Sequence, residues 1–200
     1  MKVGVLASGT GTNLQALLDT VHGREAQVVA VASDKPEAQA LERASARGVP
    51  TAVFPRADFA DRAARDEALG AWLAGQGVEL VVLAGYMQLL SAGFLARFPD
   101  RVVNVHPSLL PAFPGAHPIE DTVAYGVGVT GVTVHLVDEG VDTGSILLQA
   151  AVEVAPGDDR DAVHARLRPL EHRLLPEAVR LFARGAVRRD PANPRRMLVG

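Results

Sequence analysis

Short apolar runs alternate with amphipathic segments through the first half of this chain. Five runs have the length and composition of buried strands: Val3–Ala7, Val28–Ala32, Thr51–Phe54, Leu80–Ala84 and Val102–Val105. Helical spacing of apolar residues fills the segments between them, at residues 14–18, 37–47, 61–76 and 91–97. Alternation of this kind predicts a Rossmann-like α/β fold with a mostly parallel sheet and flanking helices. In the segment 61–76 the spacing predicts that Ala64, Ala68 and Trp72 face the core.

The second half of the chain has a different pattern. Gly131–Val137 alternates apolar and polar residues, and Ser145–Val154 does so less regularly, which predicts an antiparallel pair at one edge of a sheet of about seven strands. A long helical stripe covers residues 160–184, where Pro169 and Pro176 are expected to kink the helix or split it. We expect one domain over residues 1–200, with a core at about 1–184 and a peripheral tail at 185–200.

The loops that follow parallel strands indicate where ligands bind. Right-handed crossovers place these loops along one edge of the sheet, and ligands in such folds bind there. The loops at residues 9–13, 85–90 and 104–111 are therefore expected to share this edge. Each of them contains residues suited to binding or chemistry.

A glycine-rich loop lies between the first strand and the first helix. Ser8–Asn13 reads Ser-Gly-Thr-Gly-Thr-Asn, and backbone N–H groups at the start of a helix bind phosphate. The loop is not a Walker A sequence, and as a dinucleotide fingerprint it is incomplete because Leu14 occupies the third glycine position. The alternative is a tight turn, capped by Thr12 or Asn13, that binds nothing.

An amide and an imidazole follow the fifth strand. In extended chain Asn104 and His106 face the same side, and Asp142, in a glycine-flanked loop, is the best candidate for a third partner. A carboxylate near an imidazole favours the protonated ring, which could stabilise an oxyanion together with the amide. Taken alone, Asn104 and His106 could be a strand end with a half-buried histidine. Asp142 taken alone could form an Asx turn that closes the hairpin.

Composition and sequence setting argue against several classes of function and of binding site. The net charge is -3 and there is no cysteine, which argues against nucleic-acid binding, disulfides and thiolate metal sites. His106, His117 and His135 are on different elements, so a zinc site is possible but has no support in the sequence. Ser108 lacks the setting of a serine hydrolase. No apolar run approaches the ~20 residues of a membrane span, and the first run is too short for a signal peptide, so we expect a cytoplasmic protein.

Several segments together carry a family resemblance. Asn104–Pro111 (NVHPSLLP) and Ser8–Gln15 (SGTGTNLQ) resemble the signatures of folate-dependent formyltransferases, most closely the members that formylate glycinamide ribonucleotide. Segments that also fit are Leu83–Met87, Gly131–His135, Val141–Gly144 and Glu171–His172. The likeness extends from Met1 to about Arg184 in the family's order.

The resemblance implies formyl transfer from the co-substrate 10-formyltetrahydrofolate to the amine of glycinamide ribonucleotide, in purine synthesis. It implies that Gly11, Thr12 and Asn13 hold the ribonucleotide phosphate and that Glu171 contacts the ribose. It implies that Asn104 and His106 stabilise the tetrahedral intermediate, with Asp142 favouring protonated His106 and ordering a water. The implied folate contacts are Arg62, Met87, Gln88, Leu89, Leu90 and Asn104, with Val137, Asp138, Glu139, Gly140 and Val141 around the pterin.

Two departures and several alternatives accompany this reading. Gln88 stands where an arginine is frequent, and His117-Pro118 replaces a more histidine-rich loop.

Formyltetrahydrofolate hydrolase and methionyl-tRNA formyltransferase are the alternatives within the fold; we expect neither the regulatory domain of the first nor the basic tRNA-binding domain of the second. A dinucleotide-binding oxidoreductase would use the loop at 9–13 for its dinucleotide, whereas a non-catalytic sensor of phosphorylated metabolites would bind its ligand without turnover. Substrates are expected to be small molecules, and the protein a monomer or homodimer.

Overall fold

Parallel strands joined by helices make up the first part of this computed structural model, which describes residues 1–200 apart from the side chain of Pro194. Contacts define two compact units, residues 1–104 and residues 105–200. The first unit contains, in chain order, β1 (Lys2–Leu6), α1 (Thr12–Thr20), β2 (Gln27–Ser33), α2 (Gln39–Ser45), β3 (Thr51–Val53), the short helix η1 (Arg56–Asp58), α3 (Arg62–Gly75), β4 (Leu80–Leu83), α4 (Ala92–Arg97) and the beginning of β5 (Val102–His106).

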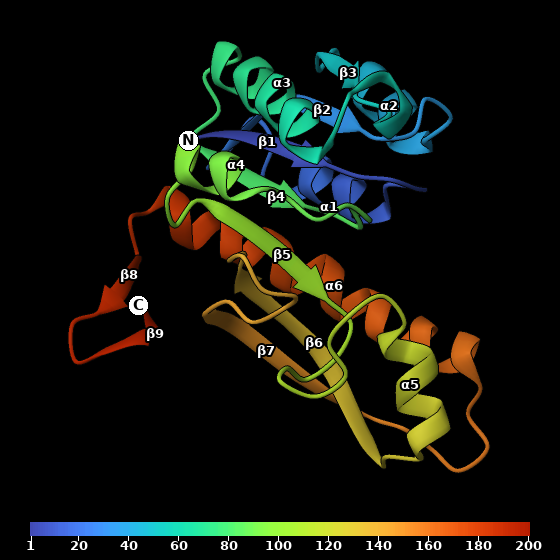
Figure 1. Ribbon diagram of the computed structural model, residues 1–200. Coiled ribbons are helices and arrows are strands. Elements are labelled where there is room, and N and C mark those ends of the chain that lie inside the picture. Colours follow the sequence, from blue (N-terminus) through green and yellow to red (C-terminus); the bar gives the residue numbers. More distant parts are fainter. The chain divides into compact units, whose positions relative to one another are not determined.

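The parallel sheet predicted from the apolar runs is confirmed. β1 pairs with β2 and β4, β2 pairs with β3, and β4 pairs with β5, all in parallel. The chain therefore winds outward from β1 in one direction and then returns to continue in the other. Right-handed crossovers place α1 and α2 on one face and α3 and α4 on the other, and Figure 1 shows α1 and α3 on opposite sides of β1.

The buried face of α3 differs from the prediction. Arg65, Leu69 and Leu73 are buried, whereas Ala64 is exposed and Trp72 is half-buried beside Phe54, with ring centroids 6.0 Å apart. The predicted stripe was wrong by one residue because the pattern treated Arg65 as a solvent-facing charge. The arginine is 2% exposed, and its charge is compensated inside the fold.

Antiparallel pairs characterise the second unit. It contains the end of β5, then α5 (Pro118–Tyr125), β6 (Val129–Leu136), β7 (Ile146–Glu153), α6 (Arg160–Ala183), β8 (Val187–Asp190) and β9 (Asn193–Val199). β6 and β7 form the antiparallel pair that the sequence predicted. The strand order is β3-β2-β1-β4-β5-β6-β7, so the seven-stranded, mostly parallel sheet with an antiparallel end is confirmed.

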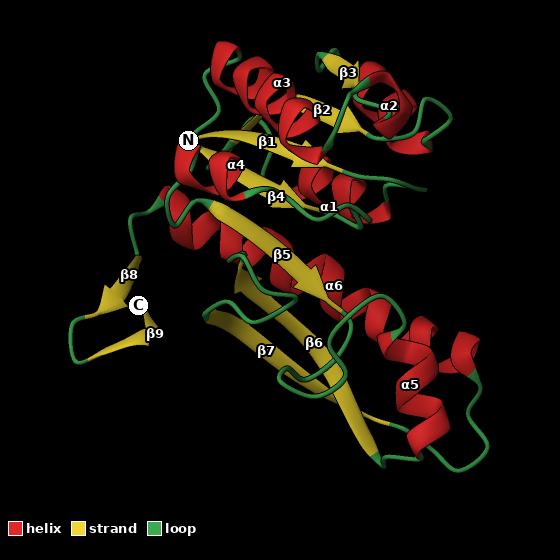
Figure 2. Ribbon diagram, viewed as in Figure 1, coloured by secondary structure: helices red, strands yellow, loops and turns green.

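Two features of this unit add to the sequence prediction, which left open whether the long helix is kinked or split. α6 is one helix that contains both Pro169 and Pro176, so it is not split (Figure 2). Apolar residues packed along it, including Leu167 and Leu175, offset the lost hydrogen bonds. The tail is also more regular than expected, because β8 and β9 form an antiparallel hairpin.

Candidate active site

The glycine-rich loop leads directly into α1. Gly11 is the N-cap and has φ +70°, and a Cβ there would lie 2.7 Å from the Cα of Ala40. Only glycine fits this position without strain or a backbone clash. Thr12 and Asn13 follow in the first turn of α1, where N–H groups have no partner within the helix. Gly11 has no side chain, so the N-cap residue itself makes no side-chain hydrogen bond to this end of the helix.

Helix α2 braces this loop through contacts that sequence patterns did not reveal. The Arg43 guanidinium donates to the Thr10 carbonyl oxygen at 2.7 Å and to the Gln15 side-chain oxygen at 3.1 Å. The Ala40 N–H donates to the Gly9 carbonyl oxygen at 3.2 Å. Arg43 therefore places positive charge beside the candidate anion site, and its position in α2 carries no signal of that role.

The loop that follows β4 adjoins the glycine-rich loop, as the shared edge predicted for these two loops requires. The Ser8 N–H donates to the Gly85 carbonyl oxygen at 3.1 Å, and the Met87 N–H donates to Ser8 Oγ at 2.9 Å. Met87 and Leu89 are 65% and 55% exposed. Two neighbouring exposed apolar side chains on a ligand-binding edge favour contact with an apolar ligand.

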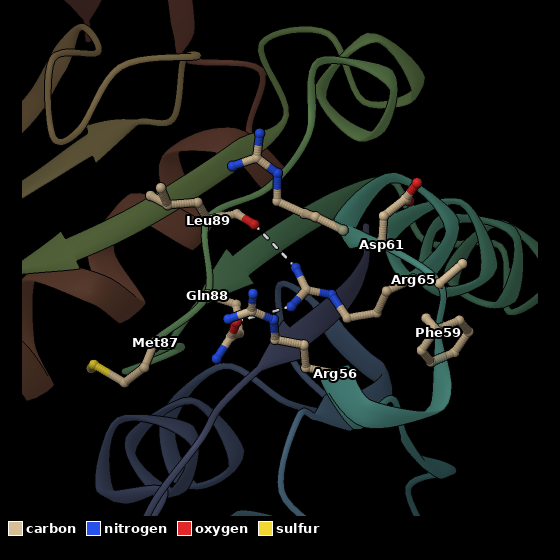
Figure 3. A pocket seen from close by; sticks show the side chains of 9 residues that line it. Arg56, Phe59, Asp61, Arg65, Met87, Gln88 and Leu89 are labelled. Atoms are coloured by element: carbon tan, nitrogen blue, oxygen red, sulfur yellow. Dashed lines mark hydrogen bonds between the residues drawn. The ribbon is translucent and has the colours of Figure 1, made fainter.

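A cavity of about 530 Å³ lies beside this loop (Figure 3). It is lined by Arg56, Phe59, Ala60, Asp61, Arg62, Arg65, Met87, Gln88 and Leu89. Four of the predicted folate contacts, Arg62, Met87, Gln88 and Leu89, thus surround one cavity, whereas Leu90 is buried beneath the loop. Its guanidinium, aromatic and thioether groups suit a ligand with an apolar ring and an anionic end.

Tyr86, at the start of the same loop, is buried next to charged groups. Burial raises the pKa of Tyr86 to about 12; the positive charge of Arg65 opposes this rise, and the carboxylates of Asp34 and Asp66 add to it. The phenol is therefore neutral near pH 7.

In the second unit, Asp142 lies between two histidines. Its carboxylate oxygens are 3.4 Å from His106 Nδ1 and 3.5 Å from His135 Nε2, and Oδ2 accepts the Gly115 N–H at 2.8 Å. Each histidine has its other ring nitrogen 2.8 Å from a backbone oxygen, that of Phe113 for His106 and that of Leu136 for His135. Carbonyl oxygens only accept, so these ring nitrogens are the donors.

Asp142 is held in its charged form. Burial favours the neutral acid, but hydrogen bonds from His135 and from the Gly115 N–H, with the charges of both histidines, lower the pKa of Asp142 below its ordinary value. The residue also has φ +54°, an uncommon conformation for a residue other than glycine. A backbone outlier at a half-buried carboxylate between two imidazoles makes this cluster a candidate functional site.

His135 was missed as a member of this group. The sequence shows it as the last polar position of an alternating strand, but β6 is buried along nearly its whole length and His135 is 2% exposed. A titratable ring in a strand flanked by Val134 and Leu136 was the available signal. Its position opposite Asp142 depends on the return of the chain through residues 137–145, which sequence periodicity does not fix.

The remaining predicted residues occupy distinct places. Asn104 is half-buried in β5, two residues before His106. Val137 is half-buried, and Asp138–Val141 form an exposed turn in which Asp138 Oδ1 accepts the Gly140 N–H at 3.1 Å. Glu171 lies on α6 and is 8% exposed.

A second cavity, of about 350 Å³, adjoins Asp142. Its lining includes the Leu110-Pro111 segment, which has a cis peptide bond, the loop at 141–146, and Asn193, Arg195 and Arg196 of the C-terminal hairpin. Arg195 donates to the Thr143 carbonyl oxygen at 3.2 Å. The tail therefore contacts the loop that carries Asp142.

Neither a metal-binding cluster nor a membrane-spanning helix is found in the described part of the chain. It contains no group of three or more histidine, cysteine, aspartate or glutamate side chains placed to hold a metal ion. Nor does any of its helices combine the length and apolar character needed to cross a membrane.

Comparison with known proteins assigns the chain to a family. A family model described as formyl transferase matches residues 1–179. A phosphoribosylglycinamide formyltransferase of Mycobacterium tuberculosis is 50% identical over 180 residues, covering 90% of this chain and 83% of that protein. A trifunctional purine biosynthetic protein adenosine-3 of Drosophila melanogaster is 44% identical over 95% of this chain, and the chain spans 14% of that protein's length.

Solved structures agree. The crystal structure of glycinamide ribonucleotide transformylase 1 from Symbiobacterium toebii matches with a TM-score of 0.94 at 46% identity, covering 100% of this chain and 93% of that chain. A phosphoribosylglycinamide formyltransferase from Anaplasma phagocytophilum matches with a TM-score of 0.92 at 33% identity, covering 100% of this chain and 94% of that one. The chain belongs to the formyl transferase family.

Proposed function

We propose that this protein transfers the formyl group of 10-formyltetrahydrofolate to the amine of glycinamide ribonucleotide, a step of purine biosynthesis. The observation that carries the proposal is the charged carboxylate of Asp142 between His106 and His135, in a chain that belongs to the formyl transferase family. Relatives at 40% to 50% identity that are named phosphoribosylglycinamide formyltransferases support this choice of substrates.

The proposed reaction is a direct acyl transfer. The substrate amine attacks the formyl carbon, a C–N bond forms, and the carbonyl oxygen becomes an oxyanion. Asn104 and His106 donate hydrogen bonds to that oxyanion, and His106 does so through the Nε2–H that the Phe113 carbonyl oxygen otherwise accepts. Preorganised donors at this point lower the barrier. The amine loses a proton to a water ordered by Asp142. The oxyanion then re-forms the carbonyl as the bond from carbon to N10 of the folate breaks, and N10 accepts the proton that this water carries.

Substrate binding is assigned to the loops after the parallel strands and to α6. Gly11, Thr12 and Asn13 bind the ribonucleotide phosphate, an assignment supported by the helix start and by Arg43 beside the loop. Glu171 contacts the ribose. The folate contacts are Arg62, Met87, Gln88, Leu89, Leu90 and Asn104, with Val137, Asp138, Glu139, Gly140 and Val141 around the pterin.

The wider setting of the enzyme is part of the proposal. Its substrates are the two small molecules, and no metal takes part. The protein acts in the cytoplasm as a monomer or a homodimer, and residues 1–200 act as one formyltransferase domain.

The deciding experiment follows tetrahydrofolate release by absorbance from 10-formyltetrahydrofolate, with and without glycinamide ribonucleotide. We expect release that depends on the ribonucleotide. Release at the same rate without it would replace the transferase with a hydrolase, which uses water as the acceptor. No release, with the ribonucleotide still bound, would leave a sensor or a different amine acceptor.

A further inference from the structure

The side chain of Gln88 lies between two charged groups at the edge of the 530 Å³ cavity. Its Nε2 donates to Asp34 Oδ2 at 2.9 Å, and its Oε1 accepts from Arg65 Nη1 at 3.0 Å (Figure 3 shows the second contact). Asp34 and Arg65 are 8% and 2% exposed. Both ends of the amide are thus engaged by buried partners of opposite charge.

Further hydrogen bonds connect Asp34 and Arg65, the two partners of Gln88, to both ends of the loop after β4. Asp34 Oδ1 accepts from Ser8 Oγ at 2.5 Å, and Ser8 Oγ accepts the Met87 N–H at 2.9 Å. On the other side, Arg65 donates to the Leu89 carbonyl oxygen at 3.1 Å and to Asp66 at 2.7 Å. The network links residues that are far apart in sequence.

The network ends at Ser91, which begins α4. The Ser91 N–H donates to Asp66 Oδ2 at 2.6 Å, and Asp66 is fully buried. Every backbone anchor of residues 87–91 in this network therefore depends on Ser8, Arg65 or Asp66. Gln88 is the neutral connection that joins the Asp34 side to the Arg65 side.

This position calls for an uncharged side chain that donates at one end and accepts at the other, as an amide does. A carboxylate would accept from Arg65 but repel Asp34, and a cation would pair with Asp34 but repel Arg65. An apolar side chain of the same length would leave polar groups of Asp34 and Arg65 unsatisfied in a buried setting. The geometry also fixes the orientation of the amide. The opposite orientation would turn its oxygen towards the Asp34 carboxylate, acceptor against acceptor, and its NH₂ group towards the Arg65 guanidinium, donor against donor.

We infer that Gln88 is a positioning residue: its side-chain amide couples Asp34 to Arg65 and thereby sets the conformation of residues 87–91, which present Met87 and Leu89 to the cavity. The folate contact assigned to Gln88 above is therefore one of its backbone, because both ends of its side chain are engaged by Asp34 and Arg65, and the side chain acts on the cavity ligand through its neighbours. The inference deepens the proposed function, on which its kinetic part rests, because the cavity is the proposed site of the formyl donor. It also accounts for a glutamine where the family resemblance led us to expect an arginine.

The test compares four variants of the full chain. Gln88→Met removes both hydrogen bonds at nearly constant length, and Gln88→Glu keeps only the bond to Arg65. The double variant Asp34→Asn/Gln88→Glu restores the pattern with donor and acceptor exchanged, since the amide introduced at position 34 can donate to the carboxylate introduced at position 88 while its oxygen still accepts from Ser8. Gln76→Met, at the end of α3 outside this cavity, is the control for a lost surface amide.

The first measurement is hydrogen exchange of the Met87 and Ser91 amides by NMR. We expect exchange to accelerate about 10-fold or more in Gln88→Met and Gln88→Glu, to return towards the parent rate in the double variant, and to be unchanged in Gln76→Met. Unchanged exchange in both single variants would overturn the inference, as would a double variant no better than Gln88→Glu.

The second measurement is steady-state kinetics. We expect KM for 10-formyltetrahydrofolate to rise about 5- to 50-fold in the single variants while kcat stays within about 3-fold, with rescue in the double variant. A rise in KM without any change in amide exchange would make Gln88 a direct ligand contact and overturn the inference. If the parent protein transfers no formyl group, the proposed function fails, and amide exchange still decides the role of Gln88.

Discussion

At the scale of single residues, Asp142 has the most demanding environment. Its carboxylate is shared by two imidazoles and a backbone N–H, and each of these contacts favours its charged form. Replacing Asp142 with Ala, or His106 with Ala, should lower kcat by ~10²–10⁴. The first change removes the carboxylate that supports the His106 imidazole, and the second removes the imidazole that stabilises the developing oxyanion. Titration calorimetry with the ribonucleotide should show affinity largely kept. A near-normal kcat for Asp142→Ala would refute this role.

The same carboxylate predicts how stability depends on pH. The pKa of Asp142 is lowered in the folded protein relative to the unfolded chain, where an aspartate titrates at about pH 4. Its contribution to the free energy of unfolding is therefore fully present above about pH 4. That contribution is lost as the pH falls from about 4 through the lowered pKa. Urea unfolding across this range should show a smaller pH dependence for Asp142→Asn than for the parent. Asp58→Asn, at an exposed site, serves as the control, and equal slopes for the parent and Asp142→Asn would contradict the assignment.

Sequence reasoning found part of this site. His106 and Asp142 were expected to act together because their residue types suit carbonyl chemistry and their setting carries the family signature, and the structure brings them within 3.4 Å; the role of Asn104 stays a prediction. His135 and Arg65 were missed because both are polar residues buried by tertiary contacts, and periodicity assigns such residues to the solvent face. Their partners, Asp142 and Gln88, are 7 and 23 residues away in sequence, beyond the range of local patterns.

At the scale of elements, the β6–β7 pair depends on one glycine. A Cβ on Gly131 would lie 2.1 Å from the carbonyl oxygen of Ala150 on the neighbouring strand. Gly131→Ala should therefore lower the free energy of unfolding by about 1–3 kcal/mol, through separation of the strands. Gly128→Ala, where the added Cβ meets nothing within 4 Å, is the matched control. Equal stabilities in chemical denaturation would show that the strands adjust without cost.

The elements themselves were largely predictable. Buried parallel strands require continuous apolar runs, and such runs identified β1 to β5 with ends correct to within a few residues. The β8–β9 hairpin escaped prediction because its strands are rich in arginine and contain a proline, so neither apolar alternation nor a turn sequence identifies them. The continuity of α6 through two prolines depends on packing, which a local rule does not include.

At the scale of the whole molecule, the C-terminal hairpin is expected to assist the reaction. Arg195 contacts the Thr143 carbonyl oxygen, one residue after Asp142. Arg195→Met should lower kcat several-fold with little change in melting temperature, because a surface contact contributes little to stability but restrains the loop. Arg188→Met, exposed on β8, is the control. If both variants turn over like the parent, the hairpin has no part in positioning Asp142.

The packing of Trp72 against Phe54 gives the chain a built-in optical label. It is the one tryptophan in the sequence, and it lies in α3 of the first unit. Its emission during denaturation therefore follows residues 1–104, whereas far-ultraviolet circular dichroism averages over both units. Coincident midpoints would mean that the two units melt as one cooperative body. Separate midpoints would give each unit its own measurable stability, without any added fluorophore.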